Sequence, residues 1–479
     1  SDNLLIRGDS LDALRALARS PEYAAHYRGK VKLVYIDPPF NTGQAFEHYD
    51  DALEHSVWLG MMRERLVLIR DLLAPDGSVW VHLDDSEMAY CKVLMDEVFG
   101  RSAYVASVLW QKSHTRENRT AISSGHEYIL VFAPLGAEWK SVRNVLPSSD
   151  EQLGRYTNPD DDYRGPWQST PMHAKAEKGR RLAQFYTIIT PSGRSVDPPP
   201  GRCWLFTRER YDELLADGRI SFAGGDGVPR VKKFLSEVQA GLVPNTWWTH
   251  PEVGTTGTGK AEIVALFSDE TPFSTPKPER LLERIIHIGS NPGDIVLDCF
   301  AGSGTTAAVA HKMGRRWVTV ELNESTADTF TAPRLTKVVN NEDPGGVTES
   351  TGWQGGGGFR QLRVAPSPWH VEDGEAYLLP DVDPATLARA VAAQLGFEPI
   401  EHPVFAARKG RTLLAVVHGV ADGTVVHDVV AALDEGQTAQ VAALAIADGA
   451  ASLLAELRPG SRLLRITTDL FPWRARFTR

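Results

Sequence analysis

Apolar residues recur at two alternating spacings along the first 134 positions of the chain. Residues 31–37 form a short apolar run that ends at a Pro-Pro turn, which predicts a buried strand followed by a loop. Residues 58–73 carry apolar side chains at helical spacing, and a Pro-Asp-Gly turn predicts the end of that helix. The same order continues with a strand at residues 78–83, a helix at 86–99 and a strand at 127–133. This alternation predicts a largely parallel sheet covered by helices.

The pattern breaks down over residues 135–250, where turn-forming clusters and aromatic residues interleaved with arginine predict an inserted, loop-rich domain. Regular order returns with a helix at residues 278–288, a strand at 294–299, a helix at 303–313 and a strand at 317–321. We therefore interpret residues 1–134 and 251–345 as two halves of one α/β domain. Residues 346–479 are expected to form a glycine-rich linker and a small α/β module.

The composition is that of an ordinary globular protein. A chain of 479 residues, of which 42% are hydrophobic, can bury a large core in two or three domains. No apolar run approaches the roughly eighteen residues of a membrane helix, and the N-terminal residues do not resemble a signal peptide. We therefore expect a cytoplasmic protein without a membrane partner. Because the chain begins at Ser1 and not at Met, we also expect native residues to precede it.

The three cysteines, Cys91, Cys203 and Cys299, lie far apart and form no CxxC pair. This spacing argues against both a disulfide framework and a zinc site. We expect buried or incidental thiols.

The net charge of −10 hides an uneven distribution. Residues 101–250 carry 20 Lys and Arg against 16 Asp and Glu, so this middle third is the candidate surface for DNA phosphates. Within it, residues 162–167 and 202–210 combine arginine with aromatic residues, a combination suited to phosphate anchoring and base contacts. The alternative is that these tryptophans pack in a core while the arginines are solvated.

The sequence Asp37-Pro38-Pro39-Phe40 follows directly after a predicted buried strand. Open α/β sheets bind ligands at the carboxyl ends of such strands. Asp37 and the Pro38 carbonyl can accept hydrogen bonds from an exocyclic amine and pull its nitrogen toward tetrahedral geometry. Phe40 offers a stacking face for a base rotated out of a duplex. The alternative is an ordinary turn at the end of a strand.

A second turn, from Asp298 to Thr306, joins a predicted strand to a predicted helix through Gly302 and Gly304. Such glycine turns let a ligand approach the backbone closely. Alone, this turn also fits the dinucleotide fingerprint of a nicotinamide-dependent dehydrogenase, with Glu321 gripping a ribose in either class. The acidic Asp298 favours a ligand with an ammonium group, such as S-adenosylmethionine.

The two turns together indicate methyl transfer to an amine, because a dehydrogenase has no use for the Asp-Pro-Pro-Phe loop. At this point the chain resembles the beta class of amino-DNA methyltransferases, most of all the modification subunits of type III restriction-modification systems. The resemblance covers roughly residues 1–360. It lies in the two turns and in the stretches at residues 7–11, 35–43, 81–87, 126–131, 275–279 and 353–359.

The resemblance implies a Rossmann-like methyltransferase fold in which residues 135–250 are a target-recognition domain. It implies that Asp37, Pro38, Pro39 and Phe40 hold the target base. The implied cofactor-binding residues are Asp9, Asp37, Lys277, Asp298, Phe300, Ala301, Gly302, Ser303, Gly304, Thr305 and Glu321. Of these, Asp9 would contact the cofactor adenine and Lys277 its carboxylate, with a solvated lysine at a helix start as the alternative for Lys277.

The expected activity is site-specific methylation of adenine N6 in double-stranded DNA by base flipping, with S-adenosylmethionine as the methyl donor. No metal is expected, since the methyl group on the sulfonium is already activated. Adenine is preferred to cytosine N4 because cytosine-specific relatives more often begin the catalytic loop with Ser. An inactive DNA-binding module of the same fold remains an alternative of another class.

We expect a homodimer, because a chain of net charge −10 is poorly equipped to hold a duplex alone and two-fold pairing is common. The last 120 residues carry 12 Lys and Arg against 14 Asp and Glu, which favours an assembly module over a DNA surface. Type III subunits are usually longer than this chain, so the sequence leaves open whether a restriction subunit is a further partner.

Overall fold

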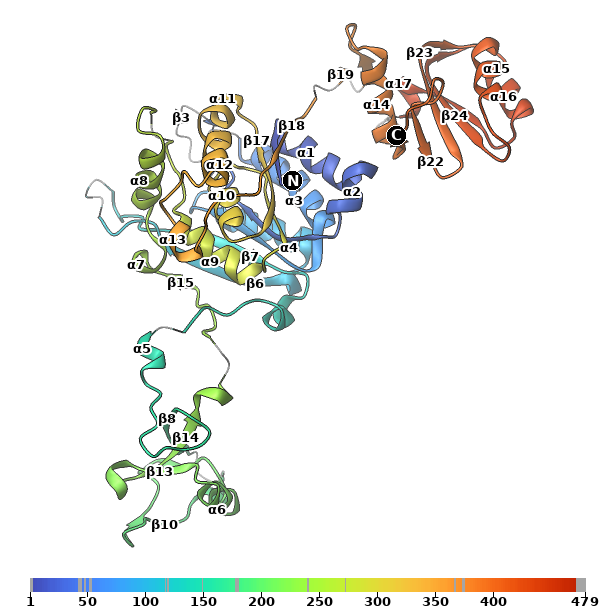
Figure 1. Ribbon diagram of the computed structural model, residues 1–479. Coiled ribbons are helices and arrows are strands. Elements are labelled where there is room, and N and C mark those ends of the chain that lie inside the picture. Colours follow the sequence, from blue (N-terminus) through green and yellow to red (C-terminus); the bar gives the residue numbers. More distant parts are fainter. Residues whose placement is uncertain are drawn as a thin grey trace. The chain divides into compact units, whose positions relative to one another are not determined.

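The computed structural model describes residues 3–41, 45–46, 49–50, 54–116, 118, 120–148, 150–176, 181–238, 241–271, 273–365, 368–372 and 375–470. Thr42 and Gly43, part of one stretch that carries the resemblance, lie outside this set. The chain divides into two compact units, one of Ser1–Asn144 with Asn245–Arg479 and one of Val145–Pro244. The second unit interrupts the first in sequence, where an insert is expected at residues 135–250 (Figure 1).

A nine-stranded sheet forms the centre of the first unit, in the order β15-β6-β7-β5-β2-β16-β17-β1-β18. Within this sheet only the pairings of β7 with β5 and β6 are antiparallel, which confirms the predicted largely parallel sheet. The strands are β1 (Leu4–Arg7), β2 (Val31–Ile36), β5 (Leu73–Leu83), β6 (Tyr104–Gln111), β7 (His126–Phe132), β15 (Trp247–Trp248), β16 (Ile295–Asp298), β17 (Arg316–Glu321) and β18 (Arg360–Arg363).

Helices cover both faces of this sheet (Figure 1). Alternate strand residues such as Val34 and Val79 pack with α1 (Ser10–Arg19), α3 (His55–Leu72) and α4 (Met88–Phe99) in one hydrophobic core. The intervening residues face the opposite way, where Gly289, the last residue of a helix on this face, packs closely: a Cβ there would lie 2.8 Å from the end of the Leu33 side chain. The second face is covered by α9 (Glu279–Gly289), α10 (Thr305–Lys312) and α12 (Ala332–Val339). This arrangement confirms the predicted Rossmann-like α/β architecture.

The order in which the chain adds strands to the sheet reverses between β2 and β16. From β16 the sheet continues through β17 to β1, and from β2 it continues through β5 to β7. Since β2 and β16 are parallel neighbours, their carboxyl ends meet at one edge. Open α/β sheets bind ligands at such a switch point. Asp37 and Asp298, predicted from two separate motifs, stand at these two strand ends.

The described residues of the inserted unit, Val145–Pro244, form short strands, two α-helices and short 3-10 helices. A three-stranded antiparallel sheet has the order β13-β14-β8, and two ribbons pair β12 with β9 and β10 with β11. The elements are α5 (Asp150–Leu153), β8 (Trp167–Pro171), β9 (His173–Lys175), β10 (Ile188–Ile189), β11 (Ser195–Val196), β12 (Arg202–Trp204), α6 (Arg208–Ala216), β13 (Ile220–Phe222) and β14 (Pro229–Phe234). Trp204 and Tyr211 lie in its own small hydrophobic core.

The glycine-rich stretch at residues 355–358, expected in a linker, instead packs against residues 251–345, the second half of the α/β domain. The Gly356 amide donates to the Val339 carbonyl over 2.7 Å, and the Gly356 carbonyl contacts His311 Nε2 at 2.9 Å. The chain then enters the central sheet as its edge strand, β18. The region belonging to the central sheet therefore continues to Arg363.

The C-terminal residues form a five-stranded sheet of order β21-β22-β23-β24-β25 with four helices, which confirms the predicted small α/β module. Its elements are α14 (Pro384–Leu395), β21 (Glu398–Pro399), β22 (Ala407–Lys409), β23 (Thr412–Ala421), α15 (Gly423–Ala431), β24 (Thr438–Ile446), α16 (Ala450–Leu457), β25 (Arg462–Arg465) and α17 (Ile466–Asp469). The hairpin of β19 (Trp369–Glu372) and β20 (Glu375–Leu378) precedes it.

All three cysteines are buried free thiols, as the sequence predicts. Among the described residues, no helix combines the length and apolar character that crossing a membrane requires.

Candidate active site

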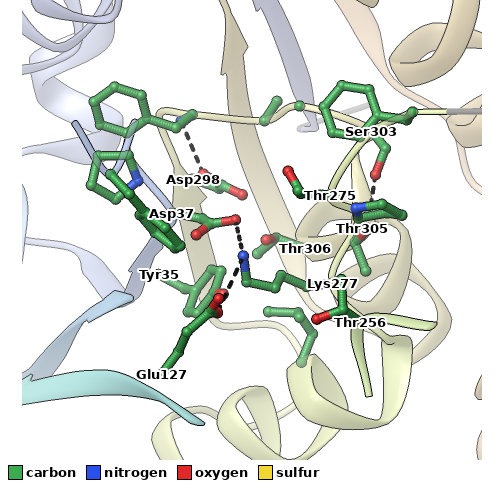
Figure 2. A pocket seen from close by; sticks show the side chains of 18 of the residues that line it. Tyr35, Asp37, Glu127, Thr256, Thr275, Lys277, Asp298, Ser303, Thr305 and Thr306 are labelled. Carbon is green, nitrogen blue, oxygen red and sulfur yellow. Dashed lines mark hydrogen bonds and ion pairs between the residues drawn. The ribbon is translucent and has the colours of Figure 1, made fainter. Parts of the chain in front are cut away.

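The Asp37 carboxylate projects into a cavity of about 310 Å³ at the switch point of the sheet. Lys277 Nζ donates to Asp37 Oδ2 over 2.7 Å (Figure 2). Asp37 Oδ1 is buried and has no hydrogen-bond partner within the described chain. Because an unpartnered buried acceptor is costly, this oxygen indicates where a ligand would donate a hydrogen bond.

Pro38, Pro39 and Phe40 line the cavity beside Asp37. The Trp58 indole nitrogen donates to the Pro39 carbonyl over 2.7 Å and so fixes this loop against α3. The Phe40 ring presents its face within 5.1 Å of Lys277 Nζ. The structure thus brings the whole predicted catalytic loop to one wall of the cavity.

The Asp298 carboxylate lies on the facing strand end and accepts from the Phe300 amide over 3.0 Å. Burial raises the pKa of Asp298 to about 7, and the negative charge of Asp37 adds to that effect. The following loop turns through Gly302 and Gly304, whose φ angles of 50° and 78° fall in the region that favours glycine. Of the predicted loop residues, those that line the cavity are Phe300, Ala301, Gly302, Ser303 and Thr305.

Three predicted cofactor residues, Gly304, Glu321 and Asp9, do not line this cavity. Glu321 braces the glycine loop, because its carboxylate accepts from the Gly302 and Asn323 amides, each over 2.8 Å. Burial raises the pKa of Glu321 to about 7. The Asp9 carboxylate caps α1 and pairs with Arg65 over 2.7 Å. Their predicted contacts to a cofactor remain predictions.

Lys277 is buried, so a solvated lysine, the alternative interpretation, is wrong. Besides Asp37, its Nζ lies 3.9 Å from Glu127 Oε2. Burial alone would lower the pKa of Lys277, but the charges of Asp37 and Glu127 raise it above its ordinary value.

The stretch that carries Lys277 packs closely against α8 (Thr256–Leu266). A Cβ on Gly259 of α8 would lie 2.4 Å from the Pro276 carbonyl, so glycine is needed at this position.

Sequence reasoning missed Glu127 as a site residue, although it lies in one of the stretches that carry the resemblance. Its carboxylate accepts from Lys112 Nζ over 3.1 Å and contacts His82 Nε2 at 2.8 Å. Burial would raise the pKa of Glu127, but Lys277 and His82 hold it well below its usual range. The sequence signal was a charged residue on an otherwise buried strand, β7.

This arrangement suits a ligand that brings both a cation and an amine. Asp298 is a buried carboxylate without a cationic partner among the described residues, and Asp37 presents an unpartnered acceptor at the adjacent strand end. The glycine loop between them lets a ligand approach the backbone. These residues therefore fit S-adenosylmethionine, whose methionine end carries an ammonium group. Among the described residues, no group of three metal-ligating side chains is close enough to hold a metal ion.

The two arginine-rich segments of the inserted unit have separate structural environments. Arg164 pairs with Asp162 and Asp217, and its guanidinium lies 4.5 Å from the Phe234 ring centroid. Trp204 is fully buried, whereas Arg208 is exposed and pairs with Asp212. Trp204 therefore packs in the core, as the alternative interpretation expected, whereas Trp167 is only half-buried and Arg202, Arg208 and Arg210 are exposed.

Comparison with known proteins identifies the family to which this architecture belongs. A family model described as DNA methylase matches residues 31–332, which is more than half of the chain. That match spans both the Asp37 loop and the Asp298 loop. The match therefore excludes the alternative interpretation of the glycine turn, a nicotinamide-dependent dehydrogenase.

Curated relatives include the type III restriction-modification enzyme StyLTI Mod subunit of Salmonella typhimurium, 33% identical over 64% of this chain and 49% of the relative. The probable type III HindVI Mod subunit of Haemophilus influenzae is 28% identical over 76% of this chain and 54% of its own length. The type II methyltransferase M.EcaI of Enterobacter cloacae is 29% identical over 61% and 62%. The chain thus spans about half the length of the type III relatives it matches.

Proposed function

Because the chain belongs to the DNA methylase family, we propose that it transfers a methyl group from S-adenosylmethionine to the N6 amine of adenine in double-stranded DNA. The observation that carries this proposal is the buried, unpartnered Oδ1 of Asp37 beside the glycine loop at the switch point. An exocyclic amine supplies the hydrogen-bond donor that this oxygen lacks.

The residues of the catalytic loop hold the amine for attack. Asp37 Oδ1 accepts one amine hydrogen and the Pro38 carbonyl accepts the other, which draws the nitrogen lone pair out of the base ring. Phe40 stacks on the base, which must leave the duplex to reach a cavity at the sheet edge. The Asp37 carboxylate lies next to the amine and can stabilise the positive charge that develops on its nitrogen.

The residues of the second loop hold the methyl donor. Asp298 takes the ammonium group, the backbone of the loop from Phe300 to Thr305 faces the methionine end, and Glu321 takes the ribose hydroxyls. When bound, the cofactor supplies a methyl group activated by its sulfonium.

Adenine is preferred to cytosine as the target base because the loop begins with Asp37 and not with Ser. The inserted unit, Val145–Pro244, serves as the target-recognition domain. Sequencing genomic DNA from a host that expresses the chain is expected to show N6-methyladenine at one recurring short sequence. Modification confined to N4 of cytosine would refute the adenine assignment, and unmodified DNA would support the inactive binding module.

The expected partners are a second copy of the chain and, as the type III relatives suggest, a restriction subunit. In a homodimer, two inserted units would share the contact with one duplex. A truncation that tests the C-terminal module should cut after residue 365, because a cut after Arg360 removes most of edge strand β18. Loss of DNA binding on this truncation is expected. A monomer mass near 52.6 kDa by light scattering, with and without DNA, would contradict the dimer.

A further inference from the structure

We propose that Lys277 is a positioning residue for the catalytic carboxylate: it occupies Asp37 Oδ2, and so leaves Oδ1 as the acceptor for the target amine. This role rests on the proposed methyl transfer. It differs from the role that the family resemblance implies for Lys277, a partner for the cofactor carboxylate. The two roles predict different kinetic effects.

The ammonium group of Lys277 is held on three sides. It lies 2.7 Å from Asp37 Oδ2, 3.9 Å from Glu127 Oε2 and 5.1 Å from the centroid of the Phe40 ring. Its side chain is only 8% exposed, so water competes little for these contacts. Figure 2 shows Lys277 extending between Asp37 and Glu127.

A cation on one carboxylate oxygen determines the role of the other. The ammonium group can only donate hydrogen bonds, so the target amine, also a donor here, cannot share its position. The amine must therefore use Oδ1, which is the buried oxygen without a partner. The charge-assisted bond at Oδ2 also restrains rotation of the carboxylate about its Cβ–Cγ bond.

A relay of hydrogen bonds across three strands holds Glu127, whose carboxylate lies 3.9 Å from Lys277 Nζ. Glu127 on β7 contacts His82 Nε2 on β5 at 2.8 Å, and His82 Nδ1 contacts the Tyr35 hydroxyl on β2 at 2.8 Å. Burial lowers the pKa of His82 and raises the pKa of Tyr35, so the imidazole is neutral and the hydroxyl keeps its proton. His82 Nε2–H then donates to Glu127, while Nδ1 accepts from Tyr35. Every member of this relay has a defined donor or acceptor role.

The charges around Lys277 argue against its binding the cofactor carboxylate. Asp37 and Glu127 already balance the two ammonium groups of this cluster, Lys277 and Lys112, which donates to Glu127 over 3.1 Å. A third carboxylate in the same buried space would leave an uncompensated negative charge, which is costly in a poorly solvated site. Lys277 therefore serves the catalytic loop.

The test separates binding of the cofactor from the chemical step. The full chain and its variants Lys277→Met, Lys277→Arg and Glu127→Gln are titrated with S-adenosylmethionine by calorimetry. Methyl transfer to unmethylated genomic DNA is then timed at saturating cofactor. Lys260→Met, which removes an exposed lysine of α8, is the matched control. Circular dichroism melts confirm that each variant is folded.

Lys277→Met is expected to slow transfer roughly 10-fold to 100-fold while the cofactor Kd changes by less than about twofold. Lys277→Arg should recover part of the rate because it restores the cation, and Glu127→Gln should slow transfer without weakening the cofactor. The control should change neither quantity. A weaker cofactor Kd with an unchanged rate at saturation would assign Lys277 to the cofactor and overturn the inference alone. If the wild-type chain transfers nothing, the proposed function fails and this role fails with it.

Discussion

Two buried lysines, one in each unit, have similar neighbours, but the carboxylates around them differ in their hydrogen bonding. Lys277 and Lys232 each lie between two carboxylates and are each 8% exposed. Each ammonium nitrogen lies 5.1 Å from an aromatic ring centroid, of Phe40 and Trp167 respectively. Burial and composition therefore do not distinguish the two clusters.

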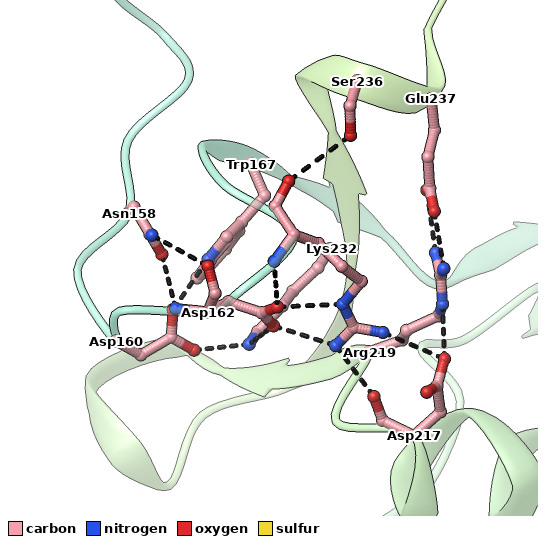
Figure 3. Close-up of polar contacts among 10 residues, drawn as sticks. Asn158, Asp160, Asp162, Trp167, Asp217, Arg219, Lys232, Ser236 and Glu237 are labelled. Atoms are coloured by element: carbon pink, nitrogen blue, oxygen red, sulfur yellow. Dashed lines mark hydrogen bonds and ion pairs between the residues drawn. The ribbon is translucent and has the colours of Figure 1, made fainter.

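The carboxylate oxygens do distinguish them. In the inserted unit, Asp160 accepts from Trp167 and Lys232, and both oxygens of Asp162 accept from Arg164 (Figure 3). In the central domain, Asp37 Oδ1 is buried without a partner. A saturated cluster of charges stabilises structure, whereas an acceptor left open in a cavity indicates a site.

The largest effect on the reaction rate is expected at Asp37, the carboxylate with the unpartnered oxygen. Asp37→Ala should reduce the rate of methyl transfer on the order of 100-fold to 1000-fold, because one preorganised polar group at the reacting centre is lost. Cofactor affinity by calorimetry should remain close to that of the wild type. Near-normal turnover would move the catalytic role to another residue.

A substitution in the cluster around Lys232, whose carboxylates are already hydrogen-bonded, should change the stability of the inserted unit. Lys232→Met leaves Asp160 without its cation and Asp162 with Arg164 alone, and removing one partner of a buried ion pair such as Lys232–Asp162 is destabilising. We expect the melting midpoint of the inserted unit to fall by roughly 5 °C or more, as followed by differential scanning calorimetry. Lys277→Met should lower the midpoint of the central domain less than it lowers the rate. If Lys232→Met left both melting transitions in place, the structural role of this cluster would be wrong.

The raised pKa of Asp298 predicts a pH-dependent affinity for the cofactor. A carboxyl group of pKa about 7 is largely protonated at pH 6, and it must lose that proton to pair with an ammonium group. The affinity is therefore nearly complete at pH 8, falls through pH 7, and is about tenfold weaker at pH 6 than at pH 8. Calorimetric titrations at several pH values measure this slope. Asp298→Asn should bind weakly with a flatter profile; an unchanged slope would assign the effect to another group.

The smallest effect is expected on the surface of the inserted unit. Lys175 and Arg202 are exposed and lie directly opposite each other in the β9–β12 ribbon, where like charges repel. A phosphate backbone would neutralise both. Replacing both with Ala should weaken DNA binding at all sequences and reduce the slope of log K against log salt by about two. Fluorescence anisotropy over a salt series measures this, and an unchanged slope would place the phosphate contacts elsewhere.

Much of the fold and both loops could be predicted because their signals lie in consecutive residues of the sequence. Asp37 and Asp298 each follow a short apolar strand, and parallel strand ends share one edge of a sheet. Lys277 was selected as a site residue, but its contact to Asp37, 240 positions away, depends on tertiary packing. Glu127 was missed because it occupies one position of an otherwise ordinary buried strand.

Charge counting was less informative than the pattern of apolar residues. The middle third has an excess of positive charge, but the inserted unit alone carries 14 Lys and Arg against 13 Asp and Glu. Several of those cations are engaged in ion pairs within the unit. Net charge says nothing of such pairing, so only the structure separates scaffold arginines from exposed ones.

The most direct test of the account is mass spectrometry of nucleosides from unmethylated DNA after incubation with the full chain and S-adenosylmethionine. The account predicts N6-methyladenine with the wild-type chain and a rate lower on the order of 100-fold or more with Asp37→Ala. Methylated adenine formed equally well by both proteins would contradict the role of Asp37. DNA left unmodified by a wild-type chain that binds the cofactor would contradict the proposed methyl transfer.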